Sequence, residues 1–298
     1  MATSRSAPPL AAYVLHSYDW SESSLVVDLF TRTQGREVVV AKGAKRPTSG
    51  FRPLLLPFHP LAAWLSRTAA DEHGEVRSLR AVEWAGGVPL PTPVLMSGFY
   101  LNELLLKGLP RHDPHPGLFD AYADTLAALA EVPQDEALAL RAFELVLLRE
   151  LGWLPELDTV TASAQPLVAT RRYTPRADSG MTADPEGPTG ATWVALQAAL
   201  LHGSPAALRQ ACRAEAAALR LPLRHLVHYH LSTPALRTRR IGQQLQRLAG
   251  VPAASGAARA GVPLAAPMSA PISAPLSAPL AEQPSAQACA SGDHPAPP

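Results

Sequence analysis

The sequence predicts an α+β protein in which a small five-stranded β-barrel precedes an all-α helical domain and a disordered C-terminal tail. Three observations indicate this organisation. Short runs of β-branched and aromatic residues fill the N-terminal part, leucines then recur with a helical period, and a Ser/Ala/Pro repeat ends the chain. The boundaries that follow are 1–84 for the barrel, 93–248 for the helical domain and 251–298 for the tail.

The barrel prediction rests on five runs with the composition of strands: Ala11–His16, Ser24–Thr31, Arg36–Ala41, Leu61–Arg67 and Glu75–Glu83. Polar turns that contain glycine join the second run to the third and the fourth run to the fifth. Five short strands in so small a unit favour a compact Greek-key barrel. An SH3-like barrel fits the same count nearly as well, so the pattern alone leaves the topology open.

The helical domain begins after the proline-rich link Pro89–Pro93, where the hydrophobic period changes. Helices are expected over Val94–Leu109, Pro116–Ala130, Asp135–Leu151, Thr192–Leu201, Pro205–Leu219 and Pro222–Leu231. The segment 155–190 is rich in Pro, Thr, Ser, Asp and Gly and has no period, so we expect an irregular insertion there. The repeats after about residue 251 bury too little apolar area to offset the entropy of ordering, so we expect disorder.

Composition excludes several classes of protein. No apolar run approaches the roughly 20 residues of a bilayer-spanning helix, and Met1–Pro9 lacks the apolar centre of a secretory signal. We therefore expect a cytoplasmic protein without a membrane partner. Cys212 and Cys289 are the two cysteines, which excludes a disulfide framework and a cysteine-rich zinc site.

The formal net charge of +1 conceals two basic zones. The segment 31–52 holds six basic residues and one acid, Glu37, and the segment 204–250 holds eight arginines and one acid, Glu215. Such zones in a near-neutral chain favour a polyanionic partner, nucleic acid or phosphate. The alternative is ordinary solubilising charge, on which lysine and glutamate would normally be mixed.

The most informative stretch of the first zone is Ala41–Pro47 (AKGAKRP), which follows a predicted strand. Gly43 permits the backbone to approach a ligand closely. Lys42, Lys45 and Arg46 can then project together toward phosphates, as in many single-strand binders. The spacing of a nucleotide-binding P-loop is absent. A solvated cationic hairpin loop is the alternative interpretation.

No catalytic constellation accompanies these cations. The sequence lacks a nucleophile elbow, a zinc-protease motif, a dinucleotide fingerprint and a convincing pair of carboxylates, so we predict a protein that is not an enzyme and needs no cofactor. His225, His228 and His230 have no nearby acid or cysteine, so they are interpreted as a polar helix face in preference to metal ligands. Most aromatic residues of the barrel are expected in its core, with one or two available to stack on bases.

Six segments in a fixed order carry a family resemblance: ESSLVVDLFT (22–31), AKGAKR (41–46), YLNEL (100–104), DPHPGLFDAY (113–122), LRAFEL (140–145) and LGWLP (151–155). Together they make the sequence similar to the RecO family of DNA repair proteins over most of residues 11–240. The resemblance implies an OB fold for the barrel and binding of single- and double-stranded DNA. It also implies strand annealing, and cooperation with RecR to load RecA on DNA coated by single-strand-binding protein (SSB).

Many members of that family carry a four-cysteine zinc module after the Leu-Gly-aromatic motif. Here Val160 and Ser163 stand near the first pair of cysteine positions, and no cysteine follows before Cys212. Thiolate ligands are missing, so we predict no zinc and a metal-free insertion at 155–190.

The hypothesis for the site is a continuous positive path that contacts the phosphate backbone of DNA. Its candidate residues are Arg36, Lys42, Lys45, Arg46 and Arg52 in the barrel, and Arg237, Arg239 and Arg240 in the helical domain. The resemblance places the acidic SSB tail on the helical domain, with Arg141 as its candidate contact, or else Arg141 pairs within the bundle through Glu144. A sequence-independent RNA-binding OB protein and a structural adaptor remain alternatives for the function.

Overall fold

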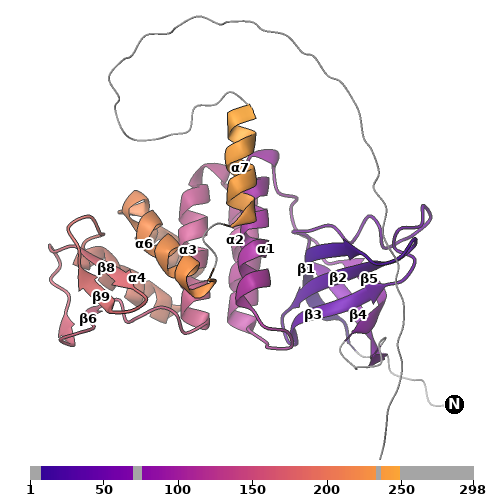
Figure 1. The fold of residues 1–298 in the computed structure, drawn as a ribbon, viewed down its shortest axis with the longest axis horizontal. Helices are drawn as coiled ribbons and strands as arrows, with labels where there is room; N and C mark the ends of the chain where they lie inside the picture. Colours follow the sequence, from indigo (N-terminus) through magenta and orange to yellow (C-terminus); the bar gives the residue numbers. More distant parts are fainter. Residues whose placement is uncertain (1–7, 70–75, 233–235, 249–298) are drawn as a thin grey trace, which may run out of the picture. The chain divides into compact units, whose positions relative to one another are not determined.

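The computed structural model describes residues 8–69, 76–232 and 236–248, and the predicted disordered tail lies outside them. Its N-terminal part is a closed five-stranded barrel of β1 (Leu10–Asp19), β2 (Leu25–Thr31), β3 (Gly35–Ala41), β4 (Leu61–Ala69) and β5 (Arg77–Trp84) (Figure 1). The strands follow one another around the barrel in the order β1-β2-β3-β5-β4. Neighbours are antiparallel except β3 and β5, which run parallel. The prediction of an OB-type barrel is confirmed.

The β2–β3 hairpin shows why this sequence forms strands. Val26 faces Val40 and Val27 faces Val39 across it, so β-branched side chains pair along the ladder. Thr31 closes the turn by donating its hydroxyl to the carbonyl of Gly35 at 2.8 Å. Gly35 has a φ of +72°, and a Cβ there would collide with the backbone of Asp113, so glycine is required.

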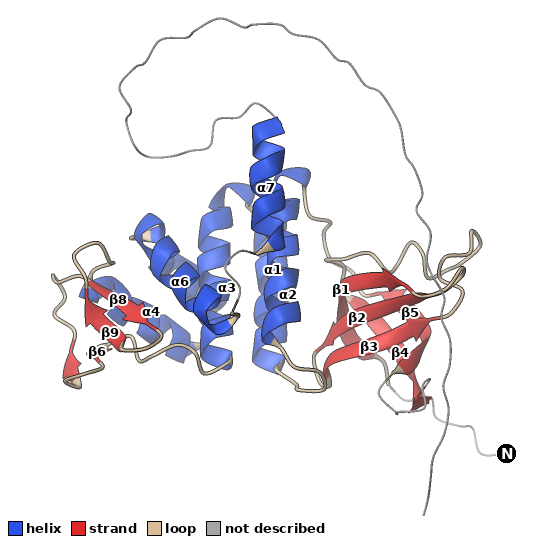
Figure 2. Cartoon of the chain, in the orientation of Figure 1, coloured by secondary structure: helices blue, strands red, loops and turns tan. Residues whose placement is uncertain are grey.

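Seven α-helices and two short 3-10 turns are described after the barrel (Figure 2). The elements are η1 (Thr92–Val94), α1 (Leu95–Gly108), α2 (Pro116–Glu131), η2 (Pro133–Asp135), α3 (Glu136–Glu150), α4 (Gly190–His202), α5 (Pro205–Arg213), α6 (Ala216–His230) and α7 (Arg237–Leu248). Among these described helices, none is both long enough and apolar enough to cross a membrane.

One predicted boundary is wrong. The helix break expected before Pro222 falls earlier, at Ala214 and Glu215, and Pro222 lies buried inside α6. Glu215 separates α5 from α6 because its φ of −140° is incompatible with a helix, and its carboxylate is bound to α4. A proline inside a helix removes one hydrogen bond. Burial of its ring in the bundle offsets part of that cost.

The insertion at 155–190 is more ordered than predicted. It contains two small two-stranded sheets, formed by β6 (Thr159–Val160) with β7 (Gln165–Pro166) and by β8 (Tyr173–Arg176) with β9 (Gly180–Ala183). The strands are too short to show a hydrophobic period, which explains why the sequence indicated a loop.

A shared core joins the barrel to the helices. Tyr13 of β1 and Phe30 of β2 point outward from the barrel and pack against Phe119 and Tyr122 of α2, with ring centroids 5.0 to 6.2 Å apart. Asn102 of α1 donates to the carbonyl of Leu15 at 2.9 Å. Because this core is continuous, the division between residues 84 and 93 stays a prediction.

Candidate nucleic-acid interface

The basic loop after β3 is built around Ala44. This residue is fully buried in the barrel core, so the loop dips inward there while its neighbours stay at the surface. Gly43 has a φ of +74°, and Arg46 donates its backbone N–H to the carbonyl of Gly43 at 3.1 Å. The resulting turn presents Lys42 and Arg46 to solvent on either side of its buried residue.

Lys45 holds this loop to the loop between β1 and β2. Its backbone N–H donates to the carbonyl of Ser23 at 2.9 Å, and its ammonium group donates to the carbonyl of Ser21 at 3.0 Å. The ammonium group also pairs with Asp19 at 3.2 Å. Lys45 therefore has a positioning role, and its charge is partly neutralised.

Lys42, Arg46 and Arg52 are the accessible cations of the first zone. All three side chains are exposed, and none forms an ion pair with a residue that the structure describes. Three cations without a neighbouring carboxylate retain their full attraction for phosphate. Lys42 and Arg46 are exposed on one short turn, Lys45 between them is bound to the β1–β2 loop, and Arg52 lies a few residues further along the same connection. Contact of these residues with DNA stays a prediction.

Arg36 does not fit the predicted role. Its guanidinium lies 3.1 Å from the carboxylate of Asp28 and donates to the carbonyls of Leu106 and Leu109 at 2.5 and 2.7 Å. The side chain is 14% exposed. Its charge is used to join the outer face of the barrel to the end of α1, so we correct the assignment of Arg36 to the DNA-contacting set.

The candidate DNA contacts of the second zone lie on α7. Arg237 and Arg240 are exposed on this helix, whereas the side chain of Arg239 is outside the described part. The helix is fixed at its start by Glu103 of α1, which accepts hydrogen bonds from the backbone of Arg237 at 2.8 Å and of Thr238 at 2.9 Å. Burial alone would raise the pKa of Glu103, but these bonds hold the pKa below its usual value.

The two zones are anchored by different residues, the first by the β1–β2 loop and the second by α1. A continuous path between them therefore remains a prediction.

Arg141 lies inside the helical bundle. It is 7% exposed, and its guanidinium donates to Glu144 at 2.7 Å and to the carbonyl of Arg220 at 3.4 Å. The structure shows the internal pair with Glu144 that was the alternative to partner binding. In this state the guanidinium is not accessible to a peptide.

A groove of about 330 Å³ lies between α2, α3 and α5. Ala128, Leu138 and Ala139 are among its apolar lining residues, and Asp124, Glu131 and Asp135 are among its polar ones. Arg209 and Arg213 line it from α5 and pair with Asp124 and Asp135 respectively. Because Asp124, Glu131 and Asp135 also line the groove, its arginines can bind an acidic ligand only where that ligand displaces their present carboxylate partners.

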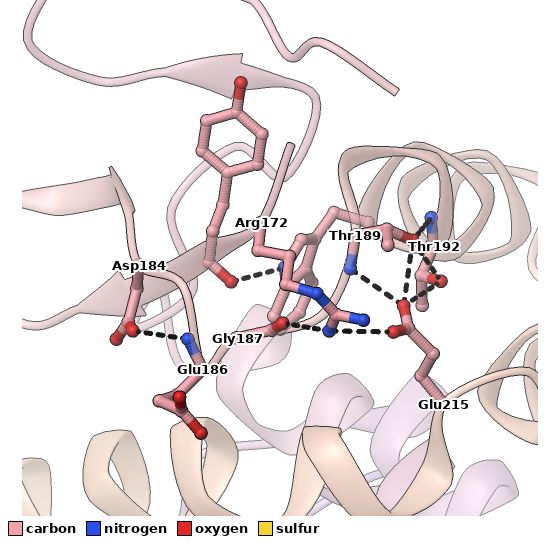
Figure 3. Close-up of polar contacts among 9 residues, drawn as sticks. Arg172, Asp184, Glu186, Gly187, Thr189, Thr192 and Glu215 are labelled. Carbon is pink, nitrogen blue, oxygen red and sulfur yellow. Dashed lines mark hydrogen bonds and ion pairs between the residues drawn. The ribbon is translucent and has the colours of Figure 1, made fainter. Parts of the chain in front are cut away.

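The insertion is fastened to the bundle by Glu215 (Figure 3). One carboxylate oxygen accepts the backbone N–H of Thr189 at 2.7 Å, the hydroxyl of Thr189 at 2.8 Å and the hydroxyl of Thr192 at 2.7 Å. The other oxygen pairs with Arg172 at 3.2 Å, and Arg172 also donates to the carbonyl of Gly187 at 2.7 Å. This carboxylate ties the start of α4 and the insertion to the start of α6.

The histidines of α6 do not converge on one point. His230 stacks on Trp153 with its ring 4.9 Å away, and burial lowers the pKa of His230. Across the described residues, no three His, Cys, Asp or Glu side chains gather as a metal site would require. Cys212 is fully buried, and burial raises the pKa of its thiol to about 12.

Sequence reasoning did not single out Trp20 or Glu103. Most aromatic residues of the barrel are expected in its core and one or two are expected to be available for stacking, and Trp20 is 68% exposed in the β1–β2 loop. A signal was available, because Trp20 stands in the polar segment DWSESS (19–24) and not in an apolar run. Glu103 gave no signal, since its partners lie more than a hundred residues away.

Two family models match the chain. The model described as the N-terminal part of recombination protein O matches residues 10–87, and the model described as its C-terminal part matches residues 94–240. The first corresponds to the barrel and the second to the helices with their insertion.

Curated relatives are similar over most of the chain. A protein of Acidovorax ebreus (strain TPSY) is 48% identical over 253 residues, covering 80% of this chain and 96% of the relative. A protein of Polaromonas naphthalenivorans (strain CJ2) is 49% identical over 244 residues, with the same coverage. A protein of Verminephrobacter eiseniae (strain EF01-2) is 46% identical over 256 residues, covering 83% of this chain and 100% of the relative. All three bear the name DNA repair protein RecO.

Proposed function

The chain belongs to the RecO family of DNA repair proteins, and from this premise we propose that it binds single- and double-stranded DNA and anneals complementary strands. We also propose that it works with RecR to load RecA on DNA coated by SSB. In this proposal the protein is not an enzyme and acts in the cytoplasm, where the chromosome of a bacterium lies. Its task is to hold strands and partners together.

The observation that carries the DNA-binding proposal is the pair of exposed cations, Lys42 and Arg46, on the turn around buried Ala44. The turn is fixed by Lys45, so these two charges are presented without a large cost in loop entropy. Phosphates of any sequence can bind them, so we expect binding that does not depend on base identity. Annealing is opposed by repulsion between two phosphate backbones, and a cationic surface lowers that cost.

The test is a Lys42→Ala/Arg46→Ala variant. Affinity for a single-stranded oligonucleotide is measured by fluorescence anisotropy at several salt concentrations. Loss of two phosphate contacts should reduce the magnitude of the salt slope by about 1.4, at about 0.7 per contact on single strands. The matched control is Arg80→Ala/Arg171→Ala, two exposed arginines outside the loop without an ion pair to a described residue.

Two results would reject the assignment. A folded Lys42→Ala/Arg46→Ala variant with the wild-type salt slope would exclude the basic loop from the interface. An RNA of the same sequence that binds more tightly than the DNA at every salt concentration would favour an RNA-binding protein instead.

We propose the groove beside α5 as the place where the SSB tail docks. Arg209 and Arg213 line the groove, whereas Arg141 is buried and bonded to Glu144, so we move the contact from Arg141 to these two residues. The incoming carboxylates would replace Asp124 and Asp135 as partners of the arginines. An SSB tail peptide should bind at least tenfold more weakly to Arg209→Ala/Arg213→Ala than to wild type, and unchanged affinity would reject the groove.

A further inference from the structure

We infer that Trp20 stacks on a base of the bound strand and thereby makes this end of the barrel prefer single-stranded over duplex nucleic acid. The inference rests on the proposed DNA-binding function and deepens it, because cations on the basic loop attract either form. Trp20 is then the residue that distinguishes the two forms.

The exposure of the Trp20 indole to solvent needs a physical reason. Trp20 is 68% exposed, whereas Trp193 of the same chain is fully buried. A tryptophan has the largest apolar surface of any side chain, and leaving it in water forfeits the gain from burying it. Tyr18, two residues earlier at the end of β1, is also half exposed and leans on His16 with ring centroids 4.4 Å apart. Aromatic surface is thus concentrated at this end of β1.

The loop that carries Trp20 is held in shape by its own backbone. The N–H groups of Trp20 and Ser21 both donate to the carbonyl of Ser24, at 3.2 and 3.3 Å. The hydroxyl of Ser21 accepts from the N–H of Ser24 at 3.1 Å. A side chain on so fixed a turn loses little backbone entropy when it binds a ligand.

The same loop is bonded to the basic loop. Lys45 donates its ammonium group to the carbonyl of Ser21, the residue next to Trp20, and pairs with Asp19 on the other side of Trp20. The hydroxyl of Ser24 also accepts from the backbone of Gly43 at 3.4 Å. The loop that carries Trp20 and the loop that carries Lys42 and Arg46 are therefore joined by hydrogen bonds. Cations that can bind phosphates and an aromatic face that can stack on a base are the two elements of a single-strand site.

The aromatic face selects single strands for a steric reason. A base in a duplex is stacked on both sides and paired at its edge, so an indole can reach its face only after the base leaves the helix, at a cost of a few kcal/mol. A base in a flexible single strand is available without that cost. The loop joining β1 to β2 is also one of the two loops that OB-folds use to bind oligonucleotides. The occupant that fits is an unpaired base whose flanking phosphates lie against the basic loop.

The experiment compares Trp20→Ala, Trp20→Phe and Trp84→Ala with wild type on a 30-nucleotide single strand and on its duplex. Trp84 is the matched control, since it is 59% exposed on the same barrel. It pairs with Leu61, which faces Ala12 near the start of β1, whereas Trp20 follows the end of β1. Trp20→Ala should weaken single-strand binding roughly tenfold, the effect of losing one stacked base. The affinity of this variant for the duplex should stay within about twofold of wild type. Its salt slope should equal that of wild type within experimental scatter. Trp20→Phe should recover most of the loss, and Trp84→Ala should change neither form.

Failure of this inference differs from failure of the proposed function. The stacking role would be overturned if Trp20→Ala bound single strands as tightly as wild type, or if it lost equal affinity for both forms of DNA. The proposed function would still stand if the Lys42→Ala/Arg46→Ala variant lowered the salt slope. If wild type itself shows no salt-dependent DNA binding, the proposed function fails first. Because Trp20 is exposed, its replacement should leave the unfolding midpoint unchanged, and a shifted midpoint together with equal losses would assign it a structural role instead.

Discussion

Tyr122 on α2 donates a 2.5 Å hydrogen bond from its phenol oxygen to Oδ1 of Asn102 on α1. The amide group of Asn102 in turn donates to the carbonyl of Leu15 on β1. Burial raises the pKa of Tyr122 well above its ordinary value, which favours the protonated phenol that donates this bond. One buried amide therefore connects two helices to the barrel.

We predict that Asn102→Ala lowers the free energy of unfolding by about 3 kcal/mol, because it leaves the Tyr122 hydroxyl and a strand carbonyl buried without their partner. Urea unfolding measures the loss. Tyr122→Phe is the companion variant, and the double variant should lose less than the sum of the two single ones, since the phenol–amide bond is counted in both. Strict additivity would show that the two groups act independently.

Arg36→Ala should affect stability and not DNA binding. Burial raises the pKa of Asp28, against the opposing effect of Arg36, and removing the guanidinium leaves this carboxyl group without its nearest partner. Breaking a buried pair in this way costs about 3 kcal/mol. Arg46→Ala is the matched control, because it removes an exposed cation from the same zone.

Unfolding and salt-dependent binding separate the two variants. Arg36→Ala should unfold at lower urea with an unchanged salt slope, and Arg46→Ala should do the reverse. Adding Asp28→Asn to Arg36→Ala should restore part of the stability, since the unpaired buried acid is removed. A lowered slope with intact stability in Arg36→Ala would return this residue to the DNA-contacting set.

Arg36 and Arg46 also show how far the sequence could predict the site. Both stand in the same cationic segment, and nothing local distinguishes them. What separates them is the end of α1, where the carbonyls of Leu106 and Leu109, some seventy residues away in the chain, accept hydrogen bonds from Arg36. Local patterns do predict most of the longer strands and helices. They do not predict which charges long-range contacts neutralise.

The fold was predictable where helices and strands are long enough to show a hydrophobic period. Leucine spacing indicated α1, α2 and α3, and the β-branched runs indicated the barrel strands. The insertion was not, because strands of two to four residues, such as β6 and β8, carry no period. The start of α6 was misplaced for a related reason. Pro222 is a strong local signal, and the carboxylate bonds of Glu215, made to distant residues, override it.

Glu103→Ala should loosen α7 without unfolding the bundle. The carboxylate accepts two backbone N–H groups at the start of this helix, which serve as an N-cap supplied by another helix. Loss of a cap costs about 1 kcal/mol, which corresponds to an about fivefold larger equilibrium constant for opening of the helix. Hydrogen exchange of the amides in 237–248 measures this.

Lys107→Ala is the control for the Glu103 variant. Lys107 pairs with Glu103 at 3.0 Å, and among the residues that the structure describes it has no bond to α7, so its loss should leave exchange in that helix nearly unchanged. Equal protection of 237–248 in Glu103→Ala and wild type would show that packing alone holds α7. If Arg237 and Arg240 contact DNA, Glu103→Ala should also weaken DNA binding modestly.

Glu215→Gln should lower stability in a pH-dependent way. Burial alone would raise the pKa of Glu215, but hydrogen bonds from Thr192 and Thr189, together with Arg172, hold the pKa below its usual value. The unfolded chain then binds this proton more readily than the folded one, so the carboxylate stabilises the fold above the ordinary glutamate pKa of about 4.3. That contribution is lost as the pH falls through the lower pKa of the folded state.

Urea unfolding between pH 3 and pH 7 tests this sign. At neutral pH the variant should be less stable by about 2 kcal/mol, the scale of hydrogen bonds to a charged group. The difference between variant and wild type should shrink as the pH drops below about 4.3, because the wild-type carboxyl then becomes neutral as well. Glu186→Gln is the control, since its side chain is exposed and forms no ion pair with a described residue, and it should show no such trend. A difference that stays constant across this range would mean that Glu215 contributes through packing, so that its charge does not fasten the insertion to the bundle.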